Sequence, residues 1–268
     1  MSDVITSKSN DKVKYAKKLV NSVSFRRCEN KFVADGLRLC EEAYKNQAEI
    51  DMVFYTTKCL KKSPEIISKI IASSKSSFEV NDDIINQVSD TDTPQGIVCV
   101  CAQNRFDIDN DELSRCKKIV ILENVQNPSN LGSIFRSCDA LGVDLVIICG
   151  QTCDIYNPKT LRGSMGAAFR VRVAFADDIS KCIQDLQILN FEVYATVPNS
   201  KAQSIINTNF KEKSAVILGN EGNGLTQGAI SHCDSQITIP MRASAESLNV
   251  SVAAGIVIWE MMKGNCHE

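Results

Sequence analysis

The sequence is poor in the residues that hold metals. It contains only two histidines, His232 and His267, and none of its twelve cysteines forms a Cys-x-x-Cys pair. Structural zinc sites need cysteine and histidine ligands at close spacing, so we expect no metal site. The cysteines are scattered, and several, such as Cys99 and Cys149, stand in apolar runs as small buried side chains. So many thiols favour a reducing compartment.

The sequence also lacks a strong net charge and a long apolar run. The formal net charge is −2 and the pI is about 5.8, so total charge neither indicates nor excludes a nucleic-acid partner. No apolar run approaches the roughly 18 residues of a membrane helix. The opening MSDVITSKSNDKVKYAKKL lacks the apolar core of a signal peptide. We therefore expect a cytoplasmic protein without a membrane span.

Two nucleotide-binding fingerprints are missing as well. The glycine-rich segment VILGNEGNGLT, residues 216–226, does not match G-x-G-x-x-G, and no G-K-[ST] follows it. Dinucleotide and P-loop sites need glycines at fixed spacing so that phosphates can approach the backbone. This counts against a nucleotide-binding Rossmann-type enzyme, which we keep as the alternative from another class.

The second part of the chain alternates between apolar strands and helices. A typical helical segment is DISKCIQDLQIL, and the strand-like segments are KKIVILENV, DLVIICG, FRVRVAF, NFEVYATV, SAVILGNE and SQITIPM. Continuous apolar strands separated by helices predict an α/β fold whose parallel sheet is covered on both faces. Ligands of such sheets bind beyond the carboxyl ends of the strands.

A polar, acidic segment, FDIDNDELSR at 106–115, predicts the domain boundary, with domains at 1–105 and 106–268. The first domain is a smaller α/β unit, with helical patterns in DKVKYAKKLVNS, GLRLCEEAYKN and SPEIISKIIASS and strand-like IDMVFYTT and QGIVCVCAQ. Residues 1–31 carry eight lysines and arginines against three acidic residues. This stretch is either a solvated helix face or a footprint for RNA phosphates. The footprint would comprise Lys12, Lys14, Lys17, Lys18, Arg26 and Arg27.

The first unusual loop is ENVQNPSNLGSIFRSCDALG, residues 123–142. We expect Pro128 to end the extended run, Ser129 or Asn130 to cap a helix, and Gly142 to end it. Arg136 lies opposite the apolar stripe of this helix. A plain cap and an exposed arginine would explain both polar residues, so this pattern alone does not require a function.

Two further loops follow strands. In residues 216–226 the glycines allow close approach to the backbone, and Glu221 is either a helix cap or an organiser of the loop. In ITIPMRASAESLNVSVAAGIVIWEMM, residues 237–262, the strand stops near Pro240. Ser247 and Asn249 then stand where caps of the last helix belong. Alternatively, exposed backbone groups at these strand ends hold an adenine.

Together the three loops resemble a known family. NPSNLGSIFRSCDALG, LGNEGNGL and IPMRASAESLNVSVA stand in the order of the three motifs of the SpoU/TrmH family, within residues 117–264. These proteins are S-adenosyl-L-methionine-dependent RNA ribose 2′-O-methyltransferases of the SPOUT superfamily. RGSMGAAF, with Ser164 and Gly166, resembles a further family segment near the cofactor. The stretches ITSKSNDKVKYAKKL, FVADGLRLCEEA and TPQGIVCV resemble the RNA substrate-binding domain that often precedes the catalytic domain.

The resemblance implies a fold and a set of site residues. It implies a SPOUT domain with a deep C-terminal trefoil knot, an exception to the usual connection rules, and a homodimer with residues of both subunits near the site. The matching catalytic positions are Asn130, Arg136, Glu221, Ser247 and Asn249. The matching cofactor-binding positions are Thr196, Leu218, Gly219, Ile239, Met241 and Leu248. One position departs from the family, which often has glycine where this chain has Ala243.

The implied reaction is methyl transfer to a ribose 2′-hydroxyl of RNA. The family's proposed base matches Arg136, although the very high pKa of arginine opposes proton abstraction. The guanidinium would alternatively bind the target phosphate and steer the hydroxyl, so the role of Arg136 stays open. The extra N-terminal domain favours ribosomal RNA, by family analogy, over transfer RNA. A non-catalytic RNA-binding module is a third possibility, and the presence of all five catalytic positions argues against it.

Overall fold

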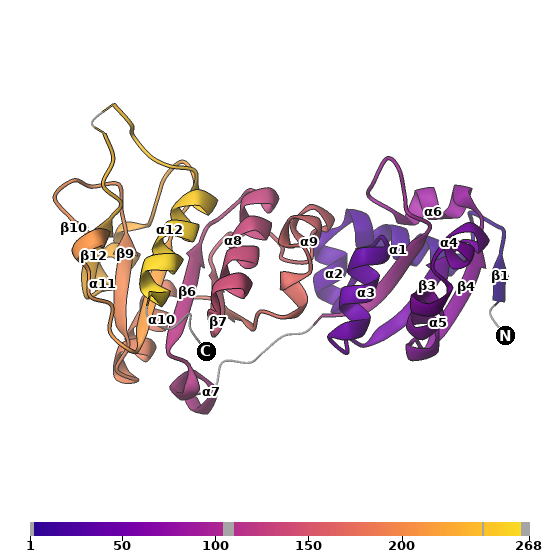
Figure 1. Ribbon diagram of the computed structural model, residues 1–268, viewed down its shortest axis with the longest axis horizontal. Helices are drawn as coiled ribbons and strands as arrows, with labels where there is room; N and C mark the ends of the chain where they lie inside the picture. Colours follow the sequence, from indigo (N-terminus) through magenta and orange to yellow (C-terminus); the bar gives the residue numbers. More distant parts are fainter. Residues whose placement is uncertain (1–2, 104–109, 243, 264–268) are drawn as a thin grey trace. The chain divides into compact units, whose positions relative to one another are not determined.

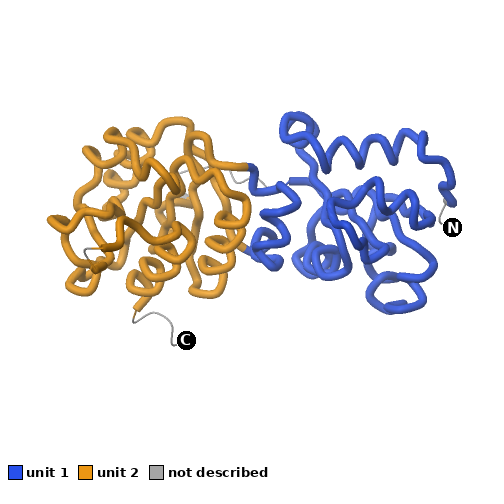
Figure 2. Tube along the Cα trace, turned by 90° about the horizontal axis from the view of Figure 1, so that it is seen from above, with its two compact units in different colours: residues 1–104, 154–170 blue, residues 105–153, 171–268 orange. Residues whose placement is uncertain are grey.

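The computed structural model describes residues 3–103, 110–242 and 244–263. The chain divides into two compact units (Figure 2): Met1–Asn104 with Asp154–Arg170, and Arg105–Cys153 with Val171–Glu268. The sequence did not predict that residues 154–170 pack with the first unit. Ala243, the position that departs from the family pattern, lies outside the described residues, as do residues 106–109 of the polar segment 106–115.

The first unit is built on a mixed five-stranded sheet in the order β1-β4-β3-β5-β2. Its strands are β1 (Asp3–Ile5), β2 (Lys31–Asp35), β3 (Ile50–Tyr55), β4 (Ser76–Val80) and β5 (Ile97–Ala102). Its helices are α1 (Asp11–Asn21), α2 (Val23–Glu29), α3 (Leu37–Lys45), α4 (Thr57–Lys62), α5 (Pro64–Ser73), α6 (Asp82–Val88), α9 (Pro158–Ser164) and the short η1 (Ala167–Phe169). The predicted helices and strands of this unit are present. The strands β1, β2 and β4 and the short helices α2, α4 and α6 were missed.

Arg26 corrects the predicted RNA footprint. Arg26 is only 1% exposed. Its guanidinium donates to Asp154 Oδ2 at 2.7 Å and to the carbonyls of Leu19 and Val20 at 2.6 and 2.9 Å. A side chain enclosed in this way has no surface to offer a phosphate. Arg26 instead joins α1 and α2 to the start of segment 154–170, which explains why that segment packs with this unit.

Replacing each of the two neighbouring arginines by alanine should affect stability differently. Arg26→Ala should lower the free energy of unfolding by about 3–5 kcal/mol, because it leaves the buried Asp154 carboxylate without its cation. Arg27→Ala is the matched control: its side chain is exposed, so the change should stay within about 0.5 kcal/mol. Urea unfolding of the full chain measures both. Equal stabilities of the two variants would contradict a structural role for Arg26.

The second unit is a parallel seven-stranded sheet in the order β10-β12-β9-β11-β6-β7-β8 (Figure 1). Its strands are β6 (Lys118–Glu123), β7 (Leu145–Cys149), β8 (Val173–Ala176), β9 (Glu192–Thr196), β10 (Gln203–Ser204), β11 (Ser214–Leu218) and β12 (Ser235–Thr238). Its helices are α7 (Asn110–Arg115), α8 (Pro128–Leu141), α10 (Ile179–Ile188), η2 (Ile205–Asn207), α11 (Gln227–His232) and α12 (Val250–Met262). All six predicted strands and the parallel arrangement are confirmed.

Helices cover both faces of this sheet. Ile119 and Ile121 of β6 pack in one core with Ile183 and Leu186 of α10 and Ala229 of α11. Helices α8 and α12 lie side by side in Figure 1 and contact each other, and α12 also contacts β6 and β11. The C-terminal helix therefore returns from the strand at one side of the sheet to its centre. The trefoil knot that the resemblance implies stays a prediction.

The start of α8 differs from the prediction. Asn127, not Ser129 or Asn130, is the N-cap, and its side chain accepts from the amides of both predicted candidates at 2.8 and 3.4 Å. Pro128 is the first helical residue, where a backbone N–H would have no acceptor within the helix. Because capping is done by Asn127, the side chain of Asn130 is free for another partner. Gly142 ends the helix in a left-handed conformation (φ 77°), as predicted.

None of the helices in the described ranges has the length and apolar character that a membrane crossing requires.

Candidate active site

Three loops leave the carboxyl ends of strands of one parallel sheet. The loop after β6 leads into α8, the loop after β11 leads into α11, and the chain after β12 leads into α12. Strands β6 and β11 are paired in register, with Leu122 beside Leu218, so their loops begin side by side. The same edge of one sheet thus collects the polar residues that are far apart in the sequence.

A directed chain of hydrogen bonds joins the three loops. Asn249 Nδ2 donates to Asn130 Oδ1 at 3.1 Å, and Asn130 Nδ2 donates to Glu221 Oε1 at 3.0 Å. Asn249 Oδ1 accepts from the backbone amide and the hydroxyl of Ser251 at 2.9 and 2.7 Å. A carboxylate can only accept and a backbone amide can only donate, so the two ends fix the orientation of both asparagine amides.

Glu221 organises the loop after β6, which decides between its two predicted roles. Its carboxylate also accepts from the backbone amides of Gln126 and Asn127, at 3.2 and 3.0 Å, whereas the cap of α11 is Thr226. Burial raises the pKa of Glu221, but the hydrogen bonds from Asn130 and from nearby backbone amides outweigh it, so the pKa lies below its usual value. The carboxylate is therefore ionised at neutral pH and accepts three hydrogen bonds from residues that follow β6.

Two of the five predicted catalytic residues stay outside this network. Ser247 is exposed and makes no hydrogen bond to any described residue. Arg136 is also exposed, and within the described ranges it has neither an ion pair nor a hydrogen bond. It follows Asn130 by six positions, which places it about 9 Å further along the axis of α8. A charged guanidinium held on a rigid helix without a partner is available to bind an anion.

The glycine loop is compact because its two ends touch. Asn220 and Gly224 exchange backbone hydrogen bonds at 3.0 Å in both directions, and Gly224 is left-handed (φ 69°). A Cβ atom at Gly219 would lie 2.4 Å from the Gly224 carbonyl carbon, so only glycine fits there. Asn220 Nδ2 also donates to the carbonyl of Asn124 at 2.8 Å. The backbone of Gly219 is therefore held at a fixed place at the sheet edge.

Comparison with known proteins decides the family. The family model described as SpoU rRNA Methylase family matches residues 117–259, and that of the MRM3-like substrate binding domain matches residues 10–99. A Bacillus subtilis protein named 23S rRNA (guanosine(2553)-2'-O)-methyltransferase RlmP is 31% identical over 96% of this chain and 98% of its own. The chain belongs to the SpoU methylase family.

Solved structures agree with this assignment. The AdoMet-bound rRNA methyltransferase from Sinorhizobium meliloti has a TM-score of 0.86 at 26% identity and covers 98% of each chain. The SpoU methyltransferase AviRb from Streptomyces viridochromogenes, solved with AdoMet, shares the fold with a TM-score of 0.84 at 22% identity, over 96% of this chain and 99% of its own. The resemblance in the three motifs is confirmed: this SpoU protein is an S-adenosyl-L-methionine-dependent RNA 2′-O-ribose methyltransferase.

The residues at the sheet edge fit the methyl donor of the SpoU family. Thr196 ends β9, beside Ile237 of β12, and its hydroxyl is buried without a hydrogen-bond partner among the described residues. An unpaired buried hydroxyl is costly, which indicates that a ligand supplies its partner. Ile239 and Met241 are partly exposed, and Leu248 is 38% exposed, so the chain after β12 presents apolar side chains at this edge. Their contact with the cofactor stays a prediction. Leu218 is buried at the end of β11.

The unpaired hydroxyl of Thr196 leads to a prediction. Thr196→Val should weaken AdoMet binding by about 3–10-fold, because one hydrogen bond is worth about 1 kcal/mol. Stability without cofactor should stay equal or rise, because the variant removes an unpaired buried hydroxyl. Calorimetric titration and thermal unfolding measure the two quantities. Unchanged AdoMet affinity together with lower stability would show that Thr196 pairs inside the protein instead.

The remaining cations of the predicted footprint are all at the surface of the first unit. Lys12, Lys14, Lys17, Lys18 and Arg27 are exposed on α1 and α2. Three of them are partly engaged. Lys14 pairs with Asp11 at 3.3 Å, and the ammonium groups of Lys12 and Lys18 lie 4.0 and 5.0 Å from the centres of the Phe78 and Phe25 rings. Their contact with RNA stays a prediction.

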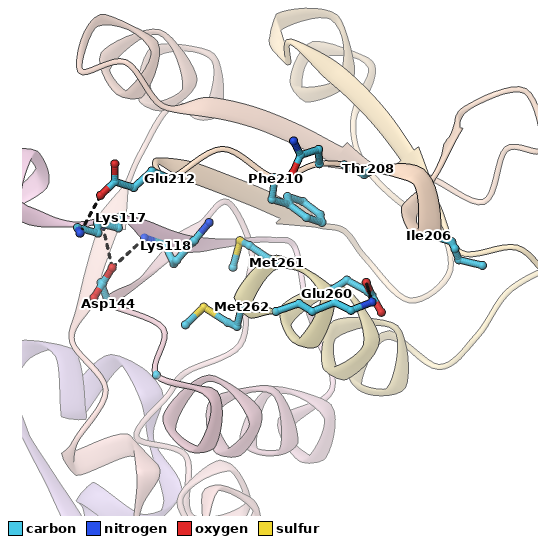
Figure 3. A pocket seen from close by; sticks show the side chains of 13 residues that line it. Lys117, Lys118, Asp144, Ile206, Thr208, Phe210, Glu212, Glu260, Met261 and Met262 are labelled. Atoms are coloured by element: carbon cyan, nitrogen blue, oxygen red, sulfur yellow. Dashed lines mark hydrogen bonds and ion pairs between the residues drawn. The ribbon is translucent and has the colours of Figure 1, made fainter. Parts of the chain in front are cut away.

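A cavity of about 820 Å³ lies at the opposite, amino edge of the SpoU sheet (Figure 3). Lys118, which begins β6, lines it together with Asp144, Phe210 and Met261. Lys117 forms an ion pair with Glu212 at 2.8 Å, and Lys118 Nζ donates to the backbone carbonyl of Lys211 at 2.7 Å. None of the predicted site residues lines this cavity, so it is separate from the candidate active site.

Sequence reasoning missed three contributors to the site. Gln126 and Asn127 hold Glu221 through backbone amides, and Ser251 orients Asn249. The Asn-Pro dipeptide at 127–128 is a helix-start signal that would have identified the true cap. No signal in the sequence would have revealed the backbone donors, because every residue carries one.

Proposed function

We propose that this enzyme methylates a ribose 2′-hydroxyl of ribosomal RNA. The observation that carries the proposal is the hydrogen-bonded chain of Glu221, Asn130 and Asn249, which assembles the family's three motifs into one polar site. Ribosomal RNA is supported by the matching N-terminal domain and by the Bacillus subtilis relative, whose name specifies 23S rRNA. We also propose that the protein acts in the cytoplasm, which the free thiols of the described cysteines support.

The network itself supplies orientation rather than a base. Asn130 and Asn249 each keep one amide N–H that no described acceptor uses, so both can donate to an oxygen of the ribose. Glu221 accepts three hydrogen bonds, and its lowered pKa makes it a weak base, so it holds Asn130 in place rather than taking the hydroxyl proton. Holding the hydroxyl in line with the methyl group supplies much of the acceleration.

Arg136 is the remaining charged group. When bound, S-adenosyl-L-methionine supplies an electrophilic methyl group on its sulfonium. The guanidinium of Arg136 binds the phosphate next to the target ribose and steers the hydroxyl, and solvent water takes the proton. This assignment follows from the exposure of Arg136 and from the very high pKa of arginine, which leaves it a cation that donates but does not accept.

The separation of Arg136 from Asn130 supports a homodimer in which each site takes Arg136 from the partner. Val252 and Trp259, seven residues apart on α12, are 52% and 53% exposed, and α12 packs against α8, which carries Arg136. The exposed apolar stripe fits a second copy of the chain. Mixing inactive Arg136→Ala and Asn130→Ala proteins should restore part of the activity, because one site of a mixed dimer is intact. Activity that stays at zero, although sedimentation shows mixed dimers, would place both residues in one subunit's site.

The substrate is tested by methyl transfer from tritiated AdoMet to total RNA of cells that lack the gene. We expect the label in the ribosomal fraction, at one position, in the alkali-resistant dinucleotides that 2′-O-methylation produces. Label confined to the transfer RNA fraction would contradict the ribosomal assignment and leave the reaction type intact.

A further inference from the structure

Glu123, the last residue of β6, is a buried carboxylate to which the mechanism assigns no role. It is 2% exposed, and both of its oxygens bind one residue: Oε2 accepts from the Thr226 amide at 2.9 Å and Oε1 from the Thr226 hydroxyl at 2.7 Å. No ion pair to it is found within the described ranges. A buried charge without a cation is costly, and the surrounding core of Ile119, Ile121 and Ala229 would not need it for packing.

Thr226 stands at the end of the glycine loop. Its hydroxyl also caps α11 by accepting from the Ala229 amide at 3.2 Å. The backbone of the two preceding residues, Gly224 and Leu225, packs directly against Gly219. A Cβ at Gly219 would lie 2.5 Å from both the Gly224 oxygen and the Leu225 nitrogen. The position of Thr226 therefore determines the position of the Gly219 backbone.

The other half of the same loop has its own anchors. Glu221 binds the loop after β6 through three donors, and Asn220 donates to the carbonyl of Asn124. These contacts do not involve Thr226 or Glu123. Loosening the Glu123–Thr226 contact should therefore displace the Gly219 side of the loop and leave the Asn130–Glu221 pair in place.

We propose that Glu123 is a positioning residue for the methyl donor, acting through Thr226 on the backbone of Gly219. The proposal rests on the assignment of Gly219 to cofactor binding. It gives the site two independent anchors: Glu221 holds the catalytic amides and Glu123 holds the cofactor loop. Because Glu123 acts on the loop and not on the sulfonium, its loss weakens AdoMet and S-adenosylhomocysteine binding by the same factor.

The experiment compares matched variants by calorimetric titration with AdoMet and with S-adenosylhomocysteine. Glu123→Ala and Thr226→Val should each raise both dissociation constants on the order of tenfold. Glu123→Gln should restore most of the affinity, because its amide oxygen can accept from the Thr226 amide and its amide nitrogen can donate to the Thr226 hydroxyl. Thr226→Ser, which keeps the hydroxyl, should bind like the wild type. At saturating AdoMet, kcat should change less than KM.

Leu145→Ala is the stability control, because Leu145 is buried at the amino end of β7, at the opposite edge of the sheet. It should lower the melting temperature without moving either dissociation constant. The proposal would be overturned if Glu123→Ala and Thr226→Val bound AdoMet as tightly as the wild type. It would also be overturned if Leu145→Ala lost as much affinity as these two variants at the same melting temperature. A loss confined to AdoMet would assign Glu123 to the sulfonium charge and overturn it as well. Wild-type protein that binds no AdoMet would instead refute the cofactor assignment itself.

Discussion

Arg136→Ala is expected to lower kcat by about 10²–10³-fold, the usual loss when one charged donor of an active site is removed. The side chain is exposed and makes no hydrogen bond or ion pair within the described ranges, so the melting temperature should not change. AdoMet affinity should also stay the same, because the arginine acts on the RNA. Arg136→Lys should recover only a small part of the lost kcat, since an ammonium lacks the planar array of N–H donors with which a guanidinium binds two phosphate oxygens at once.

Lys181→Ala is the control, because Lys181 is an exposed cation of the same unit on α10. It should retain full activity. Full methyl transfer by Arg136→Ala on unmodified RNA would remove this residue from the mechanism. A large loss of AdoMet affinity in the same variant would place the guanidinium at the cofactor.

Glu221→Gln is expected to lower kcat on the order of 10²-fold, because small displacements of the reacting groups are costly. The amide keeps the shape of the side chain but turns one acceptor into a donor, which then faces the N–H of Gln126 or those of Asn127 and Asn130. The loop after β6 and the first turn of α8, which carries Asn130, must shift. Glu212→Gln is the matched control, since Glu212 is exposed and pairs with Lys117 at the opposite edge of the sheet. This variant should keep the kcat of the wild type.

The pH dependence separates an organising from a basic role of Glu221. Its pKa is lowered in the folded protein, so its stabilising contribution is present above the unfolded value and is lost only as pH falls through the folded value. The ratio of wild-type to Glu221→Gln activity should therefore be constant between about pH 5.5 and 8. A ratio that rises across this range would show that Glu221 titrates as the base.

Strong local patterns made much of the catalytic unit predictable. Strands β6, β7 and β11 are continuous apolar runs bounded by polar residues, and α8 carries its apolar stripe at helical spacing. In the first unit, β2 was missed because KFVAD is short and runs directly into the helical pattern of α3. The cap of α8 was misplaced by a few residues because several consecutive polar residues can all cap, and only the backbone path selects Asn127.

Tertiary contacts account for what the sequence could not show. Arg26 and Arg27 are adjacent and chemically identical, yet only the packing of segment 154–170 encloses Arg26. The bond between Asn130 and Glu221 joins residues 91 positions apart, and that between Asn249 and Asn130 joins residues 119 apart. The motifs indicated that these residues matter by resemblance. The directed network that they form depends on the register of β6 against β11 and on the return of α12 to α8.

Methyl transfer to a ribose 2′-hydroxyl is tested most directly by a chemical property of its product. RNA labelled by the purified protein with tritiated AdoMet is hydrolysed in alkali, which cleaves only next to a free 2′-hydroxyl. We expect the label in alkali-resistant dinucleotides, and no labelling of the same RNA fragment with a 2′-deoxy target nucleotide. Label released as mononucleotides, or full labelling of the deoxy fragment, would place the methyl group on a base and contradict the account.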